Sequence, residues 1–244
     1  MIKYLTSEID WCEDNFVYCD KIAELWNSLT SGFFILFGLY GLYKMPIKNK
    51  YVYFFYSNNI FIGLTSILFH TTLSIEGQIL DEFSILFYIL NGVIYLEKFH
   101  KTHIKTTVLS IISVPFLVYI YPIMNRFFLF MTAPYVLYLA KKNTNYLKEI
   151  DKDIYKLICN SRLSFGISFI CWIVDIICFL PIGSHFIWHI LIAYSCYNLT
   201  VILQIIAYNR KSLYKNILHI KFINYINVPY LEFNDKNDRY IYSL

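Results

Sequence analysis

The stretch HFIWHILIAYSCYNLTVILQIIAY, residues 185–208, decides the fold class of this chain. It contains no Asp, Glu, Lys or Arg, and its two histidines, His185 and His189, stand at its beginning. A helix needs about 20 mostly apolar residues to cross a hydrocarbon core of roughly 30 Å. The stretch therefore predicts a membrane-spanning helix that carries two imidazoles near one end.

The rest of the chain has the composition of a membrane protein. Of its 244 residues 57% are hydrophobic and 16% are charged, and the mean hydropathy is +0.48. Soluble domains contain about 25% charged residues, so this composition fits lipid as the solvent. Seven stretches predict spanning helices: 27–45, 52–71, 79–97, 104–122, 126–140, 158–180 and 185–208. The predicted fold class is all-α, a polytopic membrane protein with a bundle of seven transmembrane helices.

The distribution of Lys and Arg predicts the orientation of these helices. The net charge is +4, and the basic residues gather in alternate connections, namely 44–50, 98–105, 141–157 and the segment from 209 onward. The connections 72–78 and 181–184 contain none. Cytosolic loops carry the excess of Lys and Arg, so the N-terminus is predicted on the lumenal or extracellular side and the C-terminus in the cytosol. Basic residues spread in this way do not indicate nucleic-acid binding.

Two regions are predicted along the chain. Residues 1–218 are expected to form one membrane domain that begins with a polar, acidic segment. Residues 219–244 mix Asn, Asp and Lys with aromatic residues and lack helical periodicity. We therefore expect them to form a cytosolic, partly disordered tail.

Ionisable side chains within the predicted spans are few, and all lie toward the non-cytosolic end of their helices. Such residues are costly in lipid and usually face the interior of the bundle, where they have a function. Random placement would distribute them between the two leaflets. They are His70, Asp81, Glu82, Asp175, His185 and His189.

The three histidines in this group predict a metal site. His185 and His189 are four residues apart, so both project from one face of a helix, and His70 lies at a matching depth. Three neutral imidazoles plus a water molecule form a known catalytic zinc arrangement. The alternative is that they are buried histidines hydrogen-bonded to Ser66, Asp81 or Asp175, but the convergence of three imidazoles favours zinc.

Two further residues are predicted beside the metal. Ser66 lies one turn before His70 on the same helix face, so its hydroxyl would point toward the metal. Alternatively, it bonds a carbonyl of its own helix, as membrane serines commonly do. Asp81 is expected to act either as a hydrogen-bond partner of a ligand histidine or as a proton shuttle.

The N-terminal segment is dense in oxygen donors. The side chains of Asp10, Glu13, Asn15 and Glu24, together with the backbone carbonyl of Trp11, could enclose Ca²⁺. Calcium takes about six to eight oxygen ligands. The alternative is an acidic loop that is simply solvated, and composition alone leaves both open.

Three cysteines are predicted on the oxidising side of the membrane, where disulfides form. They are Cys12, Cys19 and Cys178. The compartment permits a disulfide between two of them, but the spacing along the chain does not select the pair.

Five short runs of sequence closely resemble the signature motifs of the alkaline ceramidases. They are SEIDWCEDN (7–15), IAELWN (22–27), GLTSILFHTTL (63–73), QILDE (78–82) and HFIWH (185–189). All five occur in the order and at the spacing of that family. The resemblance covers the whole membrane domain and is weaker over residues 98–155 and in the tail.

The resemblance implies a seven-helix lipid amidase, a hydrolase that cleaves ceramide to a sphingoid base and a fatty acid in the endoplasmic reticulum or Golgi. It implies zinc on His70, His185 and His189, with Ser66 and Asp81 beside the reacting centre. It further implies a calcium site and a disulfide. The calcium ligands would be Asp10, Trp11, Glu13, Asn15 and Glu24, and the disulfide would join Cys12 to Cys178.

Two other functions are compatible with three histidines in a seven-helix bundle. One is a zinc-containing receptor of the progestin and adiponectin receptor type. The Asp-Trp-Cys-Glu segment at 10–13 and the predicted lumenal N-terminus argue against it. The other is a non-catalytic lipid-binding relative, which the joint presence of Ser66, Asp81 and the three histidines disfavours.

Overall fold

The computed structural model describes residues 7–97, 135, 138–145, 151–180, 182–209, 217–223 and 226–235. Five long helices lie within these ranges, and all five are long and apolar enough to span a membrane. They are α1 (Leu25–Lys44), α2 (Lys50–Thr72), α3 (Ile75–Glu97), α6 (Lys152–Ile176) and α7 (His185–Asn209). The described part of the chain is thus a polytopic, mainly helical membrane protein.

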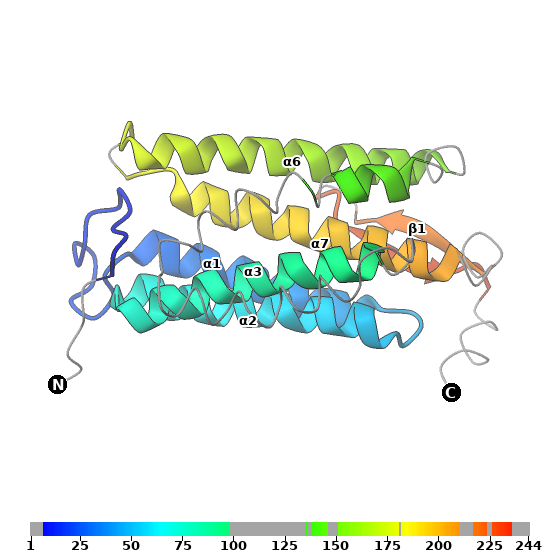
Figure 1. Ribbon diagram of the computed structural model, residues 1–244, viewed down its shortest axis with the longest axis horizontal. Helices are drawn as coiled ribbons and strands as arrows, with labels where there is room; N and C mark the ends of the chain where they lie inside the picture. Colours follow the sequence, from blue (N-terminus) through cyan, green and yellow to red (C-terminus); the bar gives the residue numbers. More distant parts are fainter. Residues whose placement is uncertain are drawn as a thin grey trace.

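The helices lie side by side along the long axis of the molecule (Figure 1). Helix α1 packs along α2, α2 along α3, and α6 along α7, while α1 and α2 also contact α7. The segment before α1 caps one end of this bundle, and the C-terminal strands lie at the opposite end (Figure 1). The ends of α2 and α6 and the starts of α1, α3 and α7 meet beneath the N-terminal segment. Polar groups from five helices can therefore meet there.

The predicted spans 27–45, 52–71, 79–97 and 185–208 agree with α1, α2, α3 and α7. The span predicted at 158–180 is shifted, because α6 begins at Lys152 and ends at Ile176. Asp151 caps this helix by accepting a hydrogen bond from the N–H of Asp153, at 2.9 Å. A hydropathy pattern does not register a polar first turn of this kind. The span predicted at 104–122 and most of that at 126–140 lie outside the described residues.

Glycines allow α1 and α2 to approach closely. A Cβ atom added at Gly38 would lie 2.7 Å from the carbonyl oxygen of Tyr56, and one added at Gly63 would lie 3.0 Å from that of Ser31. Small residues at helix contacts are a common means of close packing in membranes. The consequence is that the polar side chains of α1 lie directly against those of α2.

The region from residue 219, predicted as a partly disordered tail, contains regular structure that the sequence pattern did not predict. Strands β1 (Leu218–Phe222) and β2 (Pro229–Phe233) form an antiparallel hairpin in which Ile220 pairs with Leu231. Leu218, Ile220 and Leu231 are buried, so every second residue faces the protein. The chain is therefore not purely α-helical. An alternation of buried and exposed residues over only five positions is too short to predict a strand from the sequence. The surface of α1 and α7 against which the hairpin packs becomes known only from the structure.

Candidate metal centre and active site

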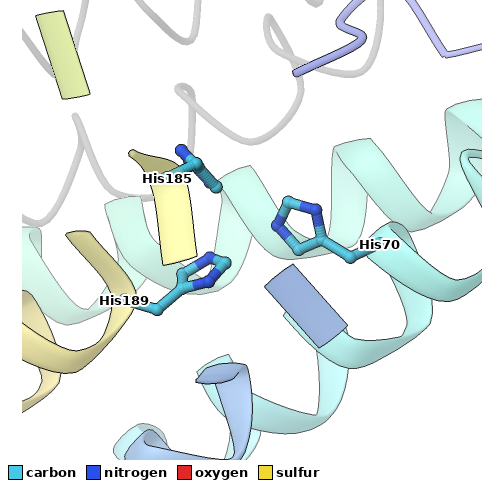
Figure 2. Close-up of side chains that lie close together, drawn as sticks. All are labelled: His70, His185 and His189. Carbon is cyan, nitrogen blue, oxygen red and sulfur yellow. The ribbon is translucent and has the colours of Figure 1, made fainter. Parts of the chain in front are cut away.

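Three histidines meet at the end of the bundle that the N-terminal segment covers. His70 comes from the end of α2, and His185 and His189 come from the first turns of α7 (Figure 2). One nitrogen of each lies within 4.8 Å of those of the other two, and the three side chains are 0%, 3% and 0% exposed. Three imidazole nitrogens gathered in this way could hold one metal ion.

The protonation of His70 follows from its partner. Its Nδ1 atom lies 2.5 Å from Oε2 of Glu24, and both side chains are fully buried. A carboxylate only accepts hydrogen bonds, so Nδ1 carries the proton. The lone pair of Nε2 is then available, and among the described residues this buried nitrogen has no hydrogen-bond partner.

The tautomer of His189 is set by a hydroxyl on α1. Oγ1 of Thr30 lies 2.7 Å from the carbonyl oxygen of Trp26, to which it donates, and 3.1 Å from Nδ1 of His189. Because its single proton is used on the carbonyl, this oxygen accepts from Nδ1–H of His189. The Nε2 lone pair of His189 is left available for a metal.

His185 is held by stacking rather than by a hydrogen bond. Its ring lies against that of Trp11, with centroids 3.8 Å apart and planes inclined by 19°. Within the described residues its Nδ1 atom is buried without a partner. A buried polar atom without a partner costs about 1–3 kcal/mol. His70 and His185 each have one such nitrogen, and a bound ion would supply the missing partner.

Ser66 and Asp81 lie beside the histidines. Oγ of Ser66 is 2.9 Å from Oγ of Ser31 on α1 and 3.5 Å from Nε2 of His189. Asp81 is 7% exposed, interacts with the Ser66 hydroxyl, and has one carboxylate oxygen without a partner among the described residues. The hydroxyl that bonds its own helix is that of the neighbouring Thr65, whereas the Ser66 hydroxyl faces Ser31, His189 and Asp81.

The alternative was that the histidines are only hydrogen-bonded to Ser66, Asp81 or Asp175. The structure supports it at a single contact. Nδ1 of His70 bonds Glu24 and not Asp81 or Asp175. The Asp175 carboxylate accepts from backbone N–H groups instead of from an imidazole. Ser66 does lie near His189, but at 3.5 Å this contact is long.

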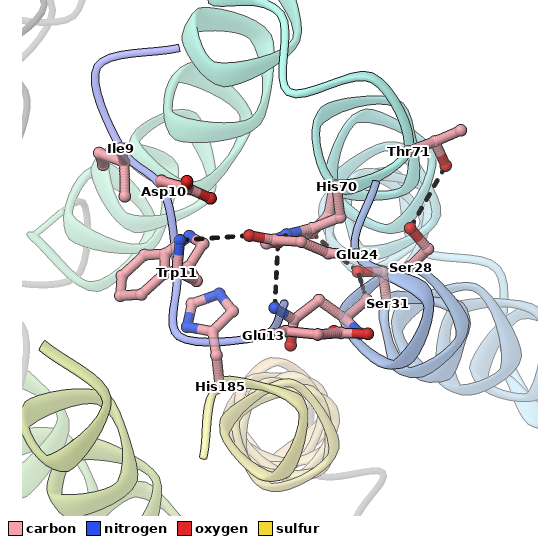
Figure 3. Close-up of polar contacts among 12 residues, drawn as sticks. Ile9, Asp10, Trp11, Glu13, Glu24, Ser28, Ser31, His70, Thr71 and His185 are labelled. Carbon is pink, nitrogen blue, oxygen red and sulfur yellow. Dashed lines mark hydrogen bonds and ion pairs between the residues drawn. The ribbon is translucent and has the colours of Figure 1, made fainter. Parts of the chain in front are cut away.

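The oxygen donors of the N-terminal segment divide into two groups. Nδ2 of Asn15 donates to both carboxylate oxygens of Asp10, at 3.0 and 3.1 Å, in an exposed part of the loop. Glu24 instead lies between the backbone N–H of Trp11 and the imidazole of His70 (Figure 3). The structure therefore connects one of the predicted calcium ligands, Glu24, directly to one of the predicted zinc ligands.

Glu13 is the other buried carboxylate of this segment. It accepts from the N–H groups of Trp26 and Asn27, at 2.7 and 2.9 Å, and so caps the start of α1. Burial raises the pKa of Glu13, and these two N–H groups oppose that shift. Asp10, Glu13 and Glu24 do not form a three-carboxylate group as tight as the histidines within the described ranges.

A disulfide fixes the N-terminal segment to α6. It joins Cys12 to Cys178, whose Cα atoms are 5.2 Å apart, and Cys19 is a free thiol. Because Trp11 precedes the bridged cysteine and stacks on His185, the disulfide also holds the aromatic wall of the metal centre.

An apolar cavity of about 160 Å³ runs through the bundle between α2, α3, α6 and α7. It passes Trp188, the residue beside His189, and extends to Leu203 at the far part of α7. Its lining is mainly aliphatic and aromatic, for example Phe55, Ile62 and Ile192, and also includes Ser161, Arg162 and Ser195. An apolar cavity of this kind could hold part of a hydrocarbon chain, and Trp188 is the lining residue adjacent in sequence to His189.

Sequence reasoning missed the contribution of α1. Thr30 and Ser31 bond His189 and Ser66, and Asn27 donates to Glu24 at 3.0 Å. One signal could have identified them. The start of α1 reads LWNSLTSG, and Asn27, Ser28, Thr30 and Ser31 are all buried there. A run of buried polar residues at the start of a spanning helix indicates a polar centre.

Fold and site together define a class: a polytopic membrane protein with a buried three-histidine centre. The protein-family model described as Ceramidase matches residues 3–232. Alkaline ceramidase 1 of Mus musculus is 35% identical over 211 residues, which cover 78% of this chain and 76% of that protein. The human alkaline ceramidase 1 is 31% identical over 210 residues (78% and 79%), and the alkaline ceramidase of Drosophila melanogaster is 32% identical over 222 residues (81% and 76%).

The chain belongs to the ceramidase family. The family resemblance predicted from the five sequence motifs is thereby confirmed. Of the three functions considered from the sequence, the lipid hydrolase is the one that agrees with these relatives.

Proposed function

We propose that this protein hydrolyses the amide bond of ceramide, giving a sphingoid base and a free fatty acid, with zinc held by His70, His185 and His189. One observation carries the zinc assignment. The Nδ1 atoms of His70 and His189 are already hydrogen-bonded, so their Nε2 atoms are left for one ion in a buried centre. The names of the relatives, alkaline ceramidases, support the substrate and the reaction.

When bound, zinc would supply a water molecule of lowered pKa and would polarise a carbonyl oxygen. Glu24 and Thr30 orient two of the ligand rings, and Trp11 covers the third. Hydrogen-bond partners of this kind fix the tautomer and direction of a ligand histidine.

Asp81 is the proton carrier. Amide hydrolysis forms a bond from the water oxygen to the carbonyl carbon and breaks the carbon–nitrogen bond. One proton must therefore leave the water and reach the amine nitrogen. Asp81 is buried beside Ser66 and has a bare carboxylate oxygen, so it can take the first proton and return one to the leaving amine.

Ser66 stabilises the negative charge that develops on the carbonyl oxygen. Ser31 donates its single proton to the carbonyl oxygen of Asn27, at 2.7 Å. The Ser66 hydroxyl lies 2.9 Å from Oγ of Ser31 and also interacts with Asp81, and it would turn from these partners to donate to the carbonyl oxygen of the substrate. A preorganised donor of this type can lower a barrier by about 3 kcal/mol. The apolar cavity past Trp188 accommodates one hydrocarbon chain of the lipid.

Calcium would be held by Asp10, Glu13, Asn15, Glu24 and the carbonyl oxygen of Trp11. An all-oxygen donor set with three carboxylates supports this assignment, because calcium is a hard cation. The proposed role is to hold the N-terminal segment over the metal centre, since Glu24 and Trp11 contact His70 and His185.

The topology proposed is seven spans, with residues 1–218 as the membrane domain and 219–244 as a cytosolic C-terminal region, in the endoplasmic reticulum or Golgi. Helix α3 ends, and α6 begins, at the end of the bundle opposite the metal centre (Figure 1). Two further spans would connect these ends, and the apolar stretches 104–122 and 126–140 are the candidates for them. The Lys-rich connections support a lumenal N-terminus.

The test is hydrolysis of ceramide by purified protein in detergent, scored as free sphingoid base, with bound zinc measured in the same samples. His189→Ala should lose zinc and at least about 100-fold in activity. His219→Ala is the matched control, because this histidine is partly exposed on the hairpin at the other end of the molecule. It should retain both properties.

Removal of zinc with a chelator should abolish hydrolysis, and added zinc should restore it. Full activity in the His189→Ala variant would contradict the zinc mechanism. Zinc-loaded wild-type protein that hydrolyses no ceramide would contradict the enzymatic assignment and favour the receptor class.

A further inference from the structure

Asp175, near the end of α6, is a buried carboxylate that the proposed reaction does not use. It is 1% exposed, and its contacts are backbone N–H groups. Oδ1 accepts hydrogen bonds from the N–H of Ser184 and, at 3.0 Å, from that of His185. Oδ2 accepts from the N–H of Cys12, at 3.4 Å. Three segments that are distant in sequence thus converge on one side chain.

The two N–H groups on Oδ1 belong to the start of α7. The first N–H groups of a helix have no partner within the helix, and a negative charge is favoured beside them. An ordinary cap is supplied by the residue just before the helix, whereas this one comes from another helix. Ser184 adds a second link by donating from its hydroxyl to the carbonyl oxygen of Cys171, at 2.6 Å. The first turn of α7 is thereby fixed against α6.

This first turn carries the metal centre. His185 is the first residue of α7, and His189 lies one turn later. A rotation or shift of the helix start would move both imidazoles together. Metal ligands tolerate errors of only about 0.5 Å, so the position of this turn decides whether both nitrogens reach one ion.

The connection before α7 is built around the Asp175 carboxylate. Gly183 has φ of +74°, a conformation that side chains rarely adopt. A Cβ atom added there would collide with Oδ1 of Asp175. Glycine at this position therefore provides both the turn and the space that the carboxylate occupies.

The third hydrogen bond extends the arrangement to the opposite wall of the site. Cys12 follows Trp11, whose ring stacks on His185 and whose N–H donates to Glu24, at 3.2 Å. Glu24 in turn bonds His70. The Asp175 carboxylate thus contacts both the segment that carries two ligands and the segment that supports the third.

We propose that Asp175 is a positioning residue of the metal centre, which clamps the first turn of α7 and the Trp11–Cys12 backbone so that the three histidines are held in ligand geometry. The inference rests on the proposed zinc-dependent function. A cap that merely stabilised the fold would lower the melting temperature and leave zinc affinity unchanged.

The experiment compares Asp175→Ala and Asp175→Asn with Asp153→Asn, which removes an exposed carboxylate from the other end of the same helix. Zinc dissociation constants are measured on purified protein in detergent by competition with a chelator of known affinity, together with kcat, KM and Tm. Asp175→Ala should raise the zinc dissociation constant by about 10–100-fold. Asp175→Asn should have a smaller effect, because its amide oxygen still accepts from Ser184 and His185. Asp153→Asn should match the wild type.

Excess zinc should restore most of the kcat of Asp175→Asn while KM stays near the wild-type value. Gly183→Ala displaces the Asp175 carboxylate without changing Asp175 itself, so it should also raise the zinc dissociation constant. This variant tests the inference even if Asp175→Ala does not fold. Unchanged zinc affinity in Asp175→Asn and Gly183→Ala, with only a lower Tm, would overturn the inference. Wild-type protein that binds no zinc would overturn the proposed function and the inference with it.

Discussion

A single hydroxyl on α1 sets the chemical state of His189. Thr30 uses its proton on the carbonyl oxygen of Trp26, so toward His189 it is an acceptor only. The imidazole must then place its proton on Nδ1 and its lone pair on Nε2. Glu24 acts on His70 in the same way. Two of the three ligand rings therefore have their tautomers fixed before any metal binds.

Thr30→Val should weaken zinc binding without unfolding the protein. Valine has nearly the same shape, but it removes the hydroxyl acceptor at 3.1 Å from Nδ1 of His189, and the loss of a hydrogen bond in a buried site costs about 1–3 kcal/mol. We expect the zinc dissociation constant to rise by about tenfold, measured by chelator competition. Thr30→Ser keeps the hydroxyl and should behave as the wild type. Equal zinc affinity in the valine and serine variants would show that the hydroxyl does not determine the tautomer.

At the scale of elements, the contact between α1 and α2 connects packing to chemistry. Gly38 and Gly63 remove the side chains that would separate the two helices. Ser31 can then bond Ser66 at 2.9 Å across the contact. The position of the Ser66 hydroxyl thus depends on backbone proximity that is set elsewhere along the same pair of helices.

Gly38→Ala should reduce both stability and activity. The added methyl group would lie 2.7 Å from the carbonyl oxygen of Tyr56, and overpacking of this kind costs about 1–3 kcal/mol. Gly32→Ala is the matched control on the same helix, since nothing lies within 4 Å of its added Cβ. We expect a lower Tm and lower kcat for Gly38→Ala and wild-type values for Gly32→Ala. Indistinguishable melting curves for the two variants would contradict the close helix contact.

At the scale of the whole molecule, the two ends of the bundle differ in chemistry. One end holds the histidines beneath the N-terminal segment, and the other carries the hairpin (Figure 1). At the hairpin end Lys44 lies 4.6 Å from the centre of the Tyr230 ring, and Lys221 pairs with Glu232. This pairing lowers the pKa of Glu232. Lys and Arg are concentrated in the connections at the hairpin end, and the positive-inside rule favours this end for the cytosolic side in the proposed orientation.

The proposed orientation predicts the outcome of glycosylation mapping. A glycosylation acceptor placed on an extension before Met1 should be modified in cells, and the same extension after Leu244 should remain unmodified. The natural acceptor at Asn198 does not interfere, because it is fully buried in α7. Gel mobility before and after enzymatic deglycosylation gives the result. Modification of the C-terminal extension alone would invert the orientation and place the metal centre on the cytosolic side.

Sequence periodicity accounts for much of this protein. The apolar runs predicted the spans that correspond to α1, α2, α3 and α7, and the spacing of His185 and His189 predicted that they share a helix face. Their depth together with that of His70 predicted a common centre. These inferences succeed for two reasons. A helix has a fixed period, and ionisable groups are so costly in lipid that those retained within a span usually have a function.

Only the tertiary structure decided which hydrogen-bond partner each polar side chain of the site has. Glu24 was predicted as a calcium ligand and lies against His70, Asp175 clamps the start of α7, and Thr30 and Ser31 were not identified at all. The hairpin also escaped prediction, because the surface of α1 and α7 that β2 packs against is not visible in the local sequence pattern. The sequence by itself determines which face of a helix a side chain occupies. The rotation of one helix against another, and hence the partner of each hydrogen bond, depends on how the glycines and large side chains of both helices pack together.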